Sequence, residues 1–113
     1  MIQILHNPRC SKSREALELL CRSGKEFEVI HYLEDSPSVD ELQILITKLG
    51  VAPLELVRQK EPLWISKFKN KSLSDAEVLQ ILADNPLLIE RPIIINGNKA
   101  VIARPIGSAA AII

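Results

Sequence analysis

The order of apolar and polar residues predicts a strand, a helix and a second strand in the first third of the chain. Residues 1–6 form a short apolar run that is typical of a buried strand. Pro8 then turns the chain, because proline lacks an N–H and keeps the preceding residue out of the helical region. Apolar residues recur on one helical face from Ser11, and this helix is expected to end near Gly24. Residues 27–33 form the second predicted strand, and a unit of this kind implies parallel strands with a right-handed crossover.

Two helices in the middle of the chain are predicted by capping boxes at their N-termini. In the first box, the Ser38 hydroxyl accepts a hydrogen bond from the N–H of Glu41, whose carboxylate reaches back to Ser38. Ser74 and Glu77 repeat the pattern at the start of the second helix. The first helix is expected to end at Gly50. Shorter helical turns are expected at residues 53–58 and 64–68.

The last third of the chain predicts a β-hairpin. Residues 91–95 are mostly β-branched, the Asn-Gly-Asn sequence at 96–98 favours a tight turn, and residues 100–102 return antiparallel. Residues 107–113 are long enough only for a short terminal helix. The elements therefore follow the order βαβ, helical insert, ββα within one domain over residues 1–113. This order predicts an α/β, thioredoxin-like fold, with a mixed four-stranded sheet flanked by helices and the insert between its halves.

Composition and charge exclude several classes of function. The 113 residues include 14 basic and 14 acidic side chains, so the chain has no overall field that would attract it to nucleic acid or to an anionic membrane. No apolar run approaches the roughly 20 residues that a membrane-spanning helix requires, and the first residues lack the pattern of a secretory signal. We therefore expect a cytoplasmic protein that has neither nucleic acid nor membrane as a partner.

Cys10 lies where the first predicted helix begins, in the sequence Asn-Pro-Arg-Cys-Ser-Lys-Ser-Arg. Unpaired backbone N–H groups and the positive end of the helix dipole favour a thiolate at this position. Arg9, Lys12 and Arg14 add positive charge within one turn. Such surroundings lower a thiol pKa from about 8.5 into a range of roughly 3.5 to 7.5. The sequence therefore predicts that Cys10 is a nucleophile at neutral pH.

The second cysteine is not expected to act as the partner of Cys10. Cys21 lies about 16 Å further along the helix axis, well beyond the ~7 Å limit on the Cα separation of a disulfide. It follows a group of leucines and is predicted to be a buried structural residue. Ser13 occupies the position where a C-x-x-C motif has its second cysteine, so an external thiol has to complete any redox reaction.

Four segments of the chain form a set that resembles a known family. They are residues 6–14 (HNPRCSKSR), 56–58 (LVR), 91–97 (RPIIING) and 101–105 (VIARP). Together with the chain length, they resemble the glutathione/glutaredoxin-coupled arsenate reductases over essentially the whole chain. The resemblance implies a thioredoxin-like fold and the reduction of arsenate to arsenite. It also implies no metal and no bound cofactor, with glutathione as co-substrate and glutaredoxin as a protein partner.

The resemblance also implies roles for individual residues. Cys10 would form a thiol–arsenate adduct, and Arg58, Arg91 and Arg104 would surround arsenate or a similar oxyanion. Guanidinium groups suit this role, because they bind tetrahedral oxyanions through bidentate, charge-assisted hydrogen bonds. Arg91 and Arg104 flank the two arms of the predicted hairpin and are each followed by proline, so they could lie side by side.

Supporting roles fall on residues near these positions. Pro92 matches the cis-proline that precedes the third strand of thioredoxin-like folds, and His6 resembles the family's histidine on the nucleophile's loop. The other supporting residues are Ser13 and Arg14. His31 is predicted to be only a polar residue on a strand.

Two other functions are compatible with the same residues. A monothiol, glutaredoxin-like oxidoreductase could act on protein–glutathione mixed disulfides, since a C-x-x-S sequence retains that chemistry. A redox-responsive regulatory binding protein of this fold would use a C-x-x-C switch, which Ser13 removes. The three arginines favour the oxyanion substrate, although each could also be an ordinary surface residue.

Overall fold

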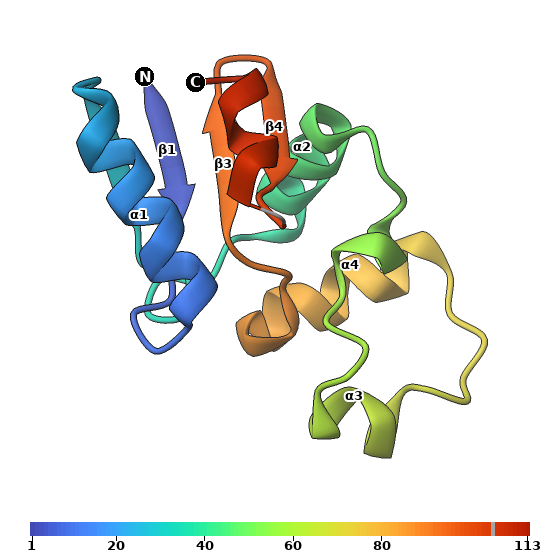
Figure 1. Cartoon of the computed structure of the whole chain (residues 1–113). Helices are drawn as coiled ribbons and strands as arrows, with labels where there is room; N and C mark the ends of the chain where they lie inside the picture. The colour runs from blue at the N-terminus through green and yellow to red at the C-terminus, as the bar shows by residue number, and fades with distance from the viewer. Residues whose placement is uncertain (105) are drawn as a thin grey trace. The chain divides into compact units, whose positions relative to one another are not determined.

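The computed structural model describes residues 1–104 and 106–113, so Pro105, the last residue of the 101–105 segment, lies outside the described part. The chain divides into two compact units. Residues 1–35 and 91–113 form the first unit, and residues 36–90 form the second (Figure 1).

The first unit is built on a mixed four-stranded sheet with the strand order β2-β1-β3-β4. The parallel pair is β1–β2, and the pairs β1–β3 and β3–β4 are antiparallel. The strands are β1 (Ile2–Leu5), β2 (Phe27–Ile30), β3 (Ile93–Asn96) and β4 (Lys99–Ile102). Both the βαβ unit and the β-hairpin that the sequence predicts are therefore confirmed, although β2 ends at Ile30 and not at the predicted residue 33.

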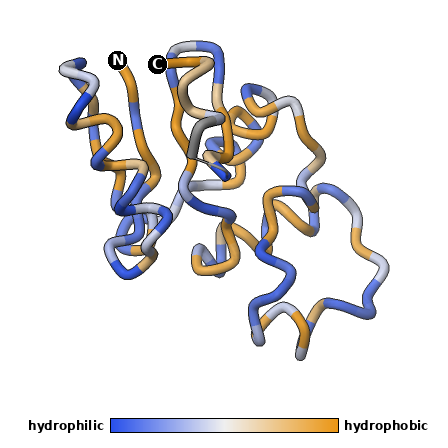
Figure 2. The backbone as a smooth tube through the Cα atoms, viewed as in Figure 1, coloured by the Kyte–Doolittle hydropathy of each residue, from blue (hydrophilic) through white to orange (hydrophobic). Residues whose placement is uncertain are grey.

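One helix and one 3-10 helix supply the rest of this unit's core. They are α1 (Ser11–Ser23) and η3 (Ile106–Ala111). Ala16 and Leu20 of α1 are fully buried against apolar residues of β1 and β3, together with Ala109 of η3. Both elements therefore cover the same face of the sheet (Figure 1). Figure 2 shows the alternating hydropathy along α1 that makes this one-sided packing possible.

The helix α1 ends as predicted, but its cysteine does not lie where the sequence analysis expected it. Gly24 adopts a left-handed conformation with φ 71°, which suits glycine at a helix C-terminus. The prediction that Cys21 is buried is wrong, because Cys21 is exposed. At about 100° per residue, Cys21 lies roughly 140° around the helix from Ala16, away from the buried face.

The second unit is helical, and both predicted capping boxes form. Ser38 Oγ accepts from the N–H of Glu41 at 3.1 Å, and Ser74 Oγ accepts from the N–H of Glu77 at 3.2 Å. The helices are α2 (Val39–Leu49), α3 (Pro62–Lys67) and α4 (Asp75–Asp84), with 3-10 helices η1 (Pro53–Leu56) and η2 (Pro86–Leu88). Contacts between α2 and α4 bury their apolar faces within this unit.

The α3 helix begins two residues earlier than predicted, because Pro62 suits the first turn of a helix. An isolated antiparallel bridge between Val57 and Ile89 joins the segments that follow η1 and η2. No helix among the described residues is both long and apolar enough to cross a membrane.

Candidate active site

Cys10 is the N-cap residue of α1. Its backbone is extended, with φ −94° and ψ 122°, and its side chain makes no capping hydrogen bond. The Cys10 N–H donates to the carbonyl of Asn7, and the Cys10 carbonyl accepts from the N–H of Arg14, each at 3.0 Å. The sulfur is therefore held at the helix N-terminus, where α1 presents N–H groups that lack helical partners.

Ser13 organises the loop before Cys10. Its side chain is fully buried, and its Oγ accepts from the N–H of Asn7 at 3.0 Å. The same Oγ shares a hydrogen bond of 2.7 Å with Nδ1 of His6. Because the hydroxyl oxygen already accepts from Asn7, its proton can be donated to a neutral His6.

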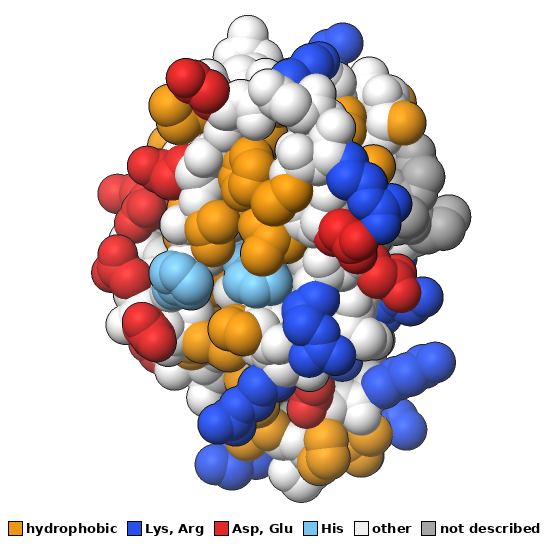
Figure 3. Space-filling model, turned by 60° about the vertical axis from the view of Figure 1, so that its left-hand side comes forward, with side chains coloured by type: hydrophobic (Ala, Val, Ile, Leu, Met, Phe, Trp, Pro, Cys, Tyr) orange, Lys and Arg blue, Asp and Glu red, His pale blue; other side chains and the backbone are white. Residues whose placement is uncertain are grey.

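His6 is buried and lies edge-on to His31, with ring centroids 6.5 Å apart (pale blue in Figure 3). Burial lowers the pKa of His6 below its ordinary value, and the charges of His31 and Arg14 lower it further, while a hydrogen bond between the ring and the Ser13 backbone opposes them. The neutral form of His6 is thus favoured near neutral pH. His31 follows the last residue of β2, so it does not lie on a strand as the sequence predicted, and its ring meets that of His6.

Asn7 is a site residue that the sequence analysis did not identify. It is buried, and its Oδ1 accepts from the N–H of Arg9 at 3.0 Å. The guanidinium of Arg14 donates to the carbonyl of Pro8 at 3.0 Å. An asparagine before a proline often forms such a turn, so the Asn-Pro pair was the available signal.

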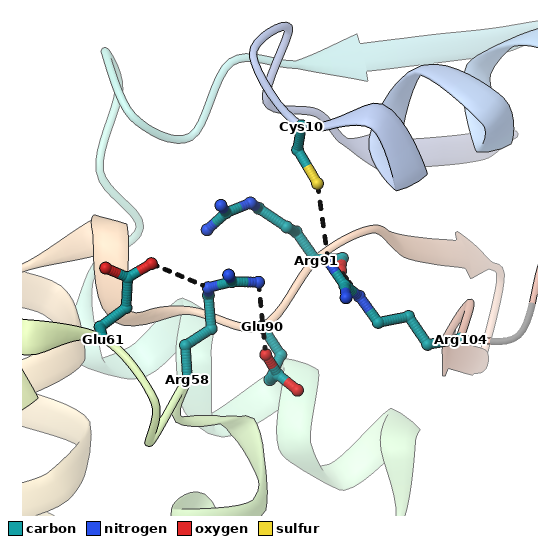
Figure 4. A network of polar contacts seen from close by, with 6 residues as sticks. All are labelled: Cys10, Arg58, Glu61, Glu90, Arg91 and Arg104. Atoms are coloured by element: carbon teal, nitrogen blue, oxygen red, sulfur yellow. Dashed lines mark hydrogen bonds and ion pairs between the residues drawn. The ribbon is translucent and has the colours of Figure 1, made fainter.

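The two arginines of the hairpin lie beside Cys10 (Figure 4). Arg104 Nη2 lies 3.5 Å from the Cys10 sulfur, and Arg104 Nε donates to the carbonyl of Arg91 at 2.5 Å. Nε and Nη1 of Arg91 are buried and have no hydrogen-bond partner among the described residues. The Arg91–Pro92 peptide bond is cis, the form that proline has at this place in thioredoxin-like folds, and Pro92 is fully buried.

The surroundings of Cys10 favour its thiolate. Burial of the sulfur raises the pKa of Cys10, but the Ser13 backbone N–H, the hydrogen bond and charge of Arg91, and the Lys12 backbone N–H lower it by more. The net pKa lies below that of an ordinary thiol. The same arginine that stabilises the thiolate therefore also has buried N–H groups to offer to a further acceptor.

Arg58, the third arginine of the predicted clamp, belongs to the second unit. Its Nε donates to Glu61 Oε1 at 3.2 Å, and its Nη1 lies 3.7 Å from Glu90 Oε1 (Figure 4). Of the predicted site residues, the structure brings His6, Cys10, Ser13, Arg14, Arg91, Pro92 and Arg104 together in the first unit. Among the described residues, no group of three histidine, cysteine or acidic side chains could hold a metal ion.

Comparison with known proteins decides the family. Residues 5–112 match the family model described as ArsC family. The chain belongs to the ArsC family. The "Uncharacterized protein YfgD" of Escherichia coli (strain K12) is 46% identical over 106 residues, which are 92% of this chain and 89% of the relative. The "Arsenate reductase" of Neisseria meningitidis (strain Z2491) is 40% identical over 114 residues, which are 99% and 97% of the two chains.

A solved structure extends the comparison to three dimensions. The "Arsenate reductase from Vibrio cholerae" has a TM-score of 0.94 and 41% identity, with 99% of this chain and 97% of that chain covered. The ArsC membership and the thioredoxin-like α/β fold that the sequence predicted are both confirmed. In this ArsC-family chain, Cys10 has a thiol with a lowered pKa and lies beside two cations, Arg91 and Arg104, an arrangement that is chemically suited to a reaction with an anion.

Proposed function

We propose that this ArsC-family protein reduces arsenate to arsenite, with Cys10 as the nucleophile. The observation that supports this most directly is that Nε and Nη1 of Arg91 are buried without a hydrogen-bond partner in the part of the chain that the structure describes, while Arg91 also stabilises the Cys10 thiolate. Leaving buried donors unsatisfied is costly, and an oxyanion would satisfy both with charge-assisted hydrogen bonds. The names of the Neisseria and Vibrio relatives support arsenate as that oxyanion.

The first step joins sulfur to arsenic. The Cys10 thiolate attacks As(V), an S–As bond forms, and one arsenate oxygen leaves as water after protonation. No electrons are transferred in this step. Arg91 and Arg104 offset the repulsion between thiolate and oxyanion, and they stabilise charge as the bond forms. We include Arg58 as the third cation of the clamp on the strength of the family resemblance.

The second step transfers the electrons. The glutathione thiolate attacks the Cys10 sulfur and the S–As bond breaks. Its electron pair stays on arsenic, which leaves as As(III) arsenite. Cys10 and glutathione remain joined as a mixed disulfide, which a glutaredoxin thiol then reduces. No cofactor has to be bound for this sequence, and glutathione is a co-substrate.

An external thiol fits the position of the chain's own groups. Ser13 cannot resolve a disulfide, and its hydroxyl is buried against His6. Cys21 is exposed and lies about three helical turns from Cys10. The proposal places the protein in the cytoplasm, where glutathione and glutaredoxin keep thiols reduced.

A coupled assay tests this function. NADPH loss is followed with arsenate, glutathione, glutaredoxin and glutathione reductase, and each component is omitted in turn. We expect turnover that requires all of them and that disappears in Cys10→Ser. Turnover with a glutathione mixed disulfide, but none with arsenate, would support the glutaredoxin-like alternative instead.

A further inference from the structure

Three cationic side chains lie within one helical turn of the nucleophile, and each of them has different surroundings. The Arg14 guanidinium donates to the carbonyl of Pro8 at 3.0 Å. The ammonium group of Lys12 lies 3.7 Å from a carboxylate oxygen of Glu15. The Arg9 side chain is exposed, and within residues 1–104 and 106–113 it has neither a hydrogen bond nor an ion pair. Arg9 is therefore a cation that the described residues leave without an anionic partner.

The backbone of Arg9 is held beside Cys10 by a buried residue. Asn7 Oδ1 accepts from the N–H of Arg9, and the Asn7 carbonyl accepts from the N–H of Cys10, each at 3.0 Å. Asn7 is itself buried, and its N–H donates to the buried Oγ of Ser13 at 3.0 Å. Consecutive Cα atoms lie about 3.8 Å apart, so the exposed Arg9 side chain starts from a fixed point directly next to the nucleophilic residue.

The proposed second step brings a further anion to Cys10. Arg91 and Arg104 are then engaged by the oxygen atoms of the arsenic adduct. Glutathione has two carboxylates and one ammonium group, and its reacting thiolate adds another negative charge. Like charges repel, so the approach of this anion to the adduct is slow unless a further cation lies nearby. A guanidinium suits that role, because it binds a carboxylate through two parallel, charge-assisted hydrogen bonds.

We propose that Arg9 binds a carboxylate of the glutathione molecule that attacks Cys10, and so selects a thiol that carries such a group. This inference rests on the proposed function for the step in which glutathione reacts. It assigns separate cations to the two anions that meet at the sulfur. Arg91 and Arg104 hold the oxyanion, and Arg9 holds the co-substrate without touching arsenic.

Thiol–disulfide exchange tests this role of Arg9 without arsenate. The Cys10 thiolate attacks one sulfur of oxidised glutathione and forms a Cys10–glutathione disulfide, while the other half leaves as a thiolate with the electron pair of the broken S–S bond. This mixed disulfide is the species that the proposed second step also produces. Hydroxyethyl disulfide, which is neutral, is the reference reagent. All proteins carry Cys21→Ser, so that Cys10 is their only cysteine.

Arg9→Gln should lower the rate constant for oxidised glutathione about two- to fivefold, which is the range for an exposed ion pair, and should leave that for hydroxyethyl disulfide unchanged. Oxidised glutathione with ethyl-esterified carboxylates should react no more slowly with Arg9→Gln than with the parent. Arg22→Gln is the matched control. It removes the same charge from the exposed surface of α1, about 18 Å along the helix axis from Cys10, and should change none of the three rate constants.

The three rate constants separate recognition of a carboxylate from an effect on the thiol. A loss in Arg9→Gln that occurs only with the free carboxylates supports the inference. An equal loss with hydroxyethyl disulfide overturns it, because Arg9 would then act on Cys10 itself, and so does an equal loss with the ester or no loss at all. If the coupled assay shows no arsenate reduction, the proposed function falls. The exchange rates then still decide the role of Arg9, since no arsenate takes part in them.

Discussion

Arg91→Lys tests most directly whether an arginine fork is required at the candidate site. The lysine keeps a positive charge next to Cys10 but provides one nitrogen in place of the planar guanidinium. In the parent, Nε and Nη1 of Arg91 are both buried, and neither has a partner within residues 1–104 and 106–113, so an oxyanion could accept from both. The substitution therefore removes at least one charge-assisted hydrogen bond to the substrate while the local charge is unchanged.

The expected loss of activity in Arg91→Lys follows from the number of hydrogen bonds removed. A hydrogen bond that involves a charged group contributes about 1.5–3 kcal/mol. If it strengthens as Cys10 attacks arsenic, its loss lowers kcat/KM for arsenate about ten- to hundredfold. Iodoacetamide is neutral and offers no oxyanion to bind. Its rate with Cys10, measured well above the thiol pKa, should change less than about threefold, because all of the thiol is then ionised.

The role of Arg91 is decided by comparing the loss in arsenate reduction with the loss in alkylation of Cys10 by iodoacetamide. Arg22→Lys, on the exposed surface of α1, is the matched control and should alter neither reaction. Equal losses in arsenate reduction and in alkylation would show that Arg91 acts on the thiol alone. The argument for a tetrahedral oxyanion substrate would then lose its main support.

Three further results are expected. Cys21→Ser should leave arsenate turnover unchanged and alter the free energy of unfolding by less than about 0.5 kcal/mol, because the side chain is exposed. A variant that folds but is inactive would show that Cys21 is a resolving thiol. Ser13→Ala should lower the free energy of unfolding, measured by urea denaturation, by about 1–3 kcal/mol, since His6 and the N–H of Asn7 both lose a buried hydrogen-bond partner. An unchanged urea midpoint would contradict the hydrogen bonds of Ser13. The pKa of His6 is lowered on folding, so as the pH falls through about 6.5 the His6 side chain is protonated in the unfolded chain before it is protonated in the folded protein. The free energy of unfolding should therefore decrease as the pH falls through this range. An equally steep decrease in His6→Asn would exclude His6 as the cause of the pH dependence.

The features that the sequence predicted well depend on neighbouring residues. The capping box at Ser38, the end of α1 at Gly24 and the hairpin turn at Gly97 each require only a few adjacent positions. Cys10 could be placed at the start of α1 for the same reason, because Pro8 and the apolar periodicity after Ser11 locate the helix N-terminus. That residues 1–113 fold as one domain stays a prediction.

Features that depend on the path of a loop, or on distant segments, could not be predicted. The burial of Ser13 against His6 requires the exact turn between them, and the exposure of Cys21 requires knowing which face of α1 meets the sheet. Arg58 and Glu90 are far apart in the chain and meet only because a backbone bridge forms between their segments. Charge and composition carry no information about such a bridge.

The register of the hairpin fixes more than its own hydrogen bonds. Ile93 faces Ile102, and the N–H of Ala103 donates to the carbonyl of Pro92, so the same pairing continued one step further sets Arg91 against Arg104. The register of the two strands, which the short turn at Gly97 sets, therefore fixes the relative positions of the two guanidinium groups. Adding one residue to that turn would shift one strand by one residue along the other, and the arginine on it would then face the opposite side of the sheet. Exposed turns usually tolerate changes in length, but in this chain the length of one turn sets the spacing of the two charges beside the nucleophile.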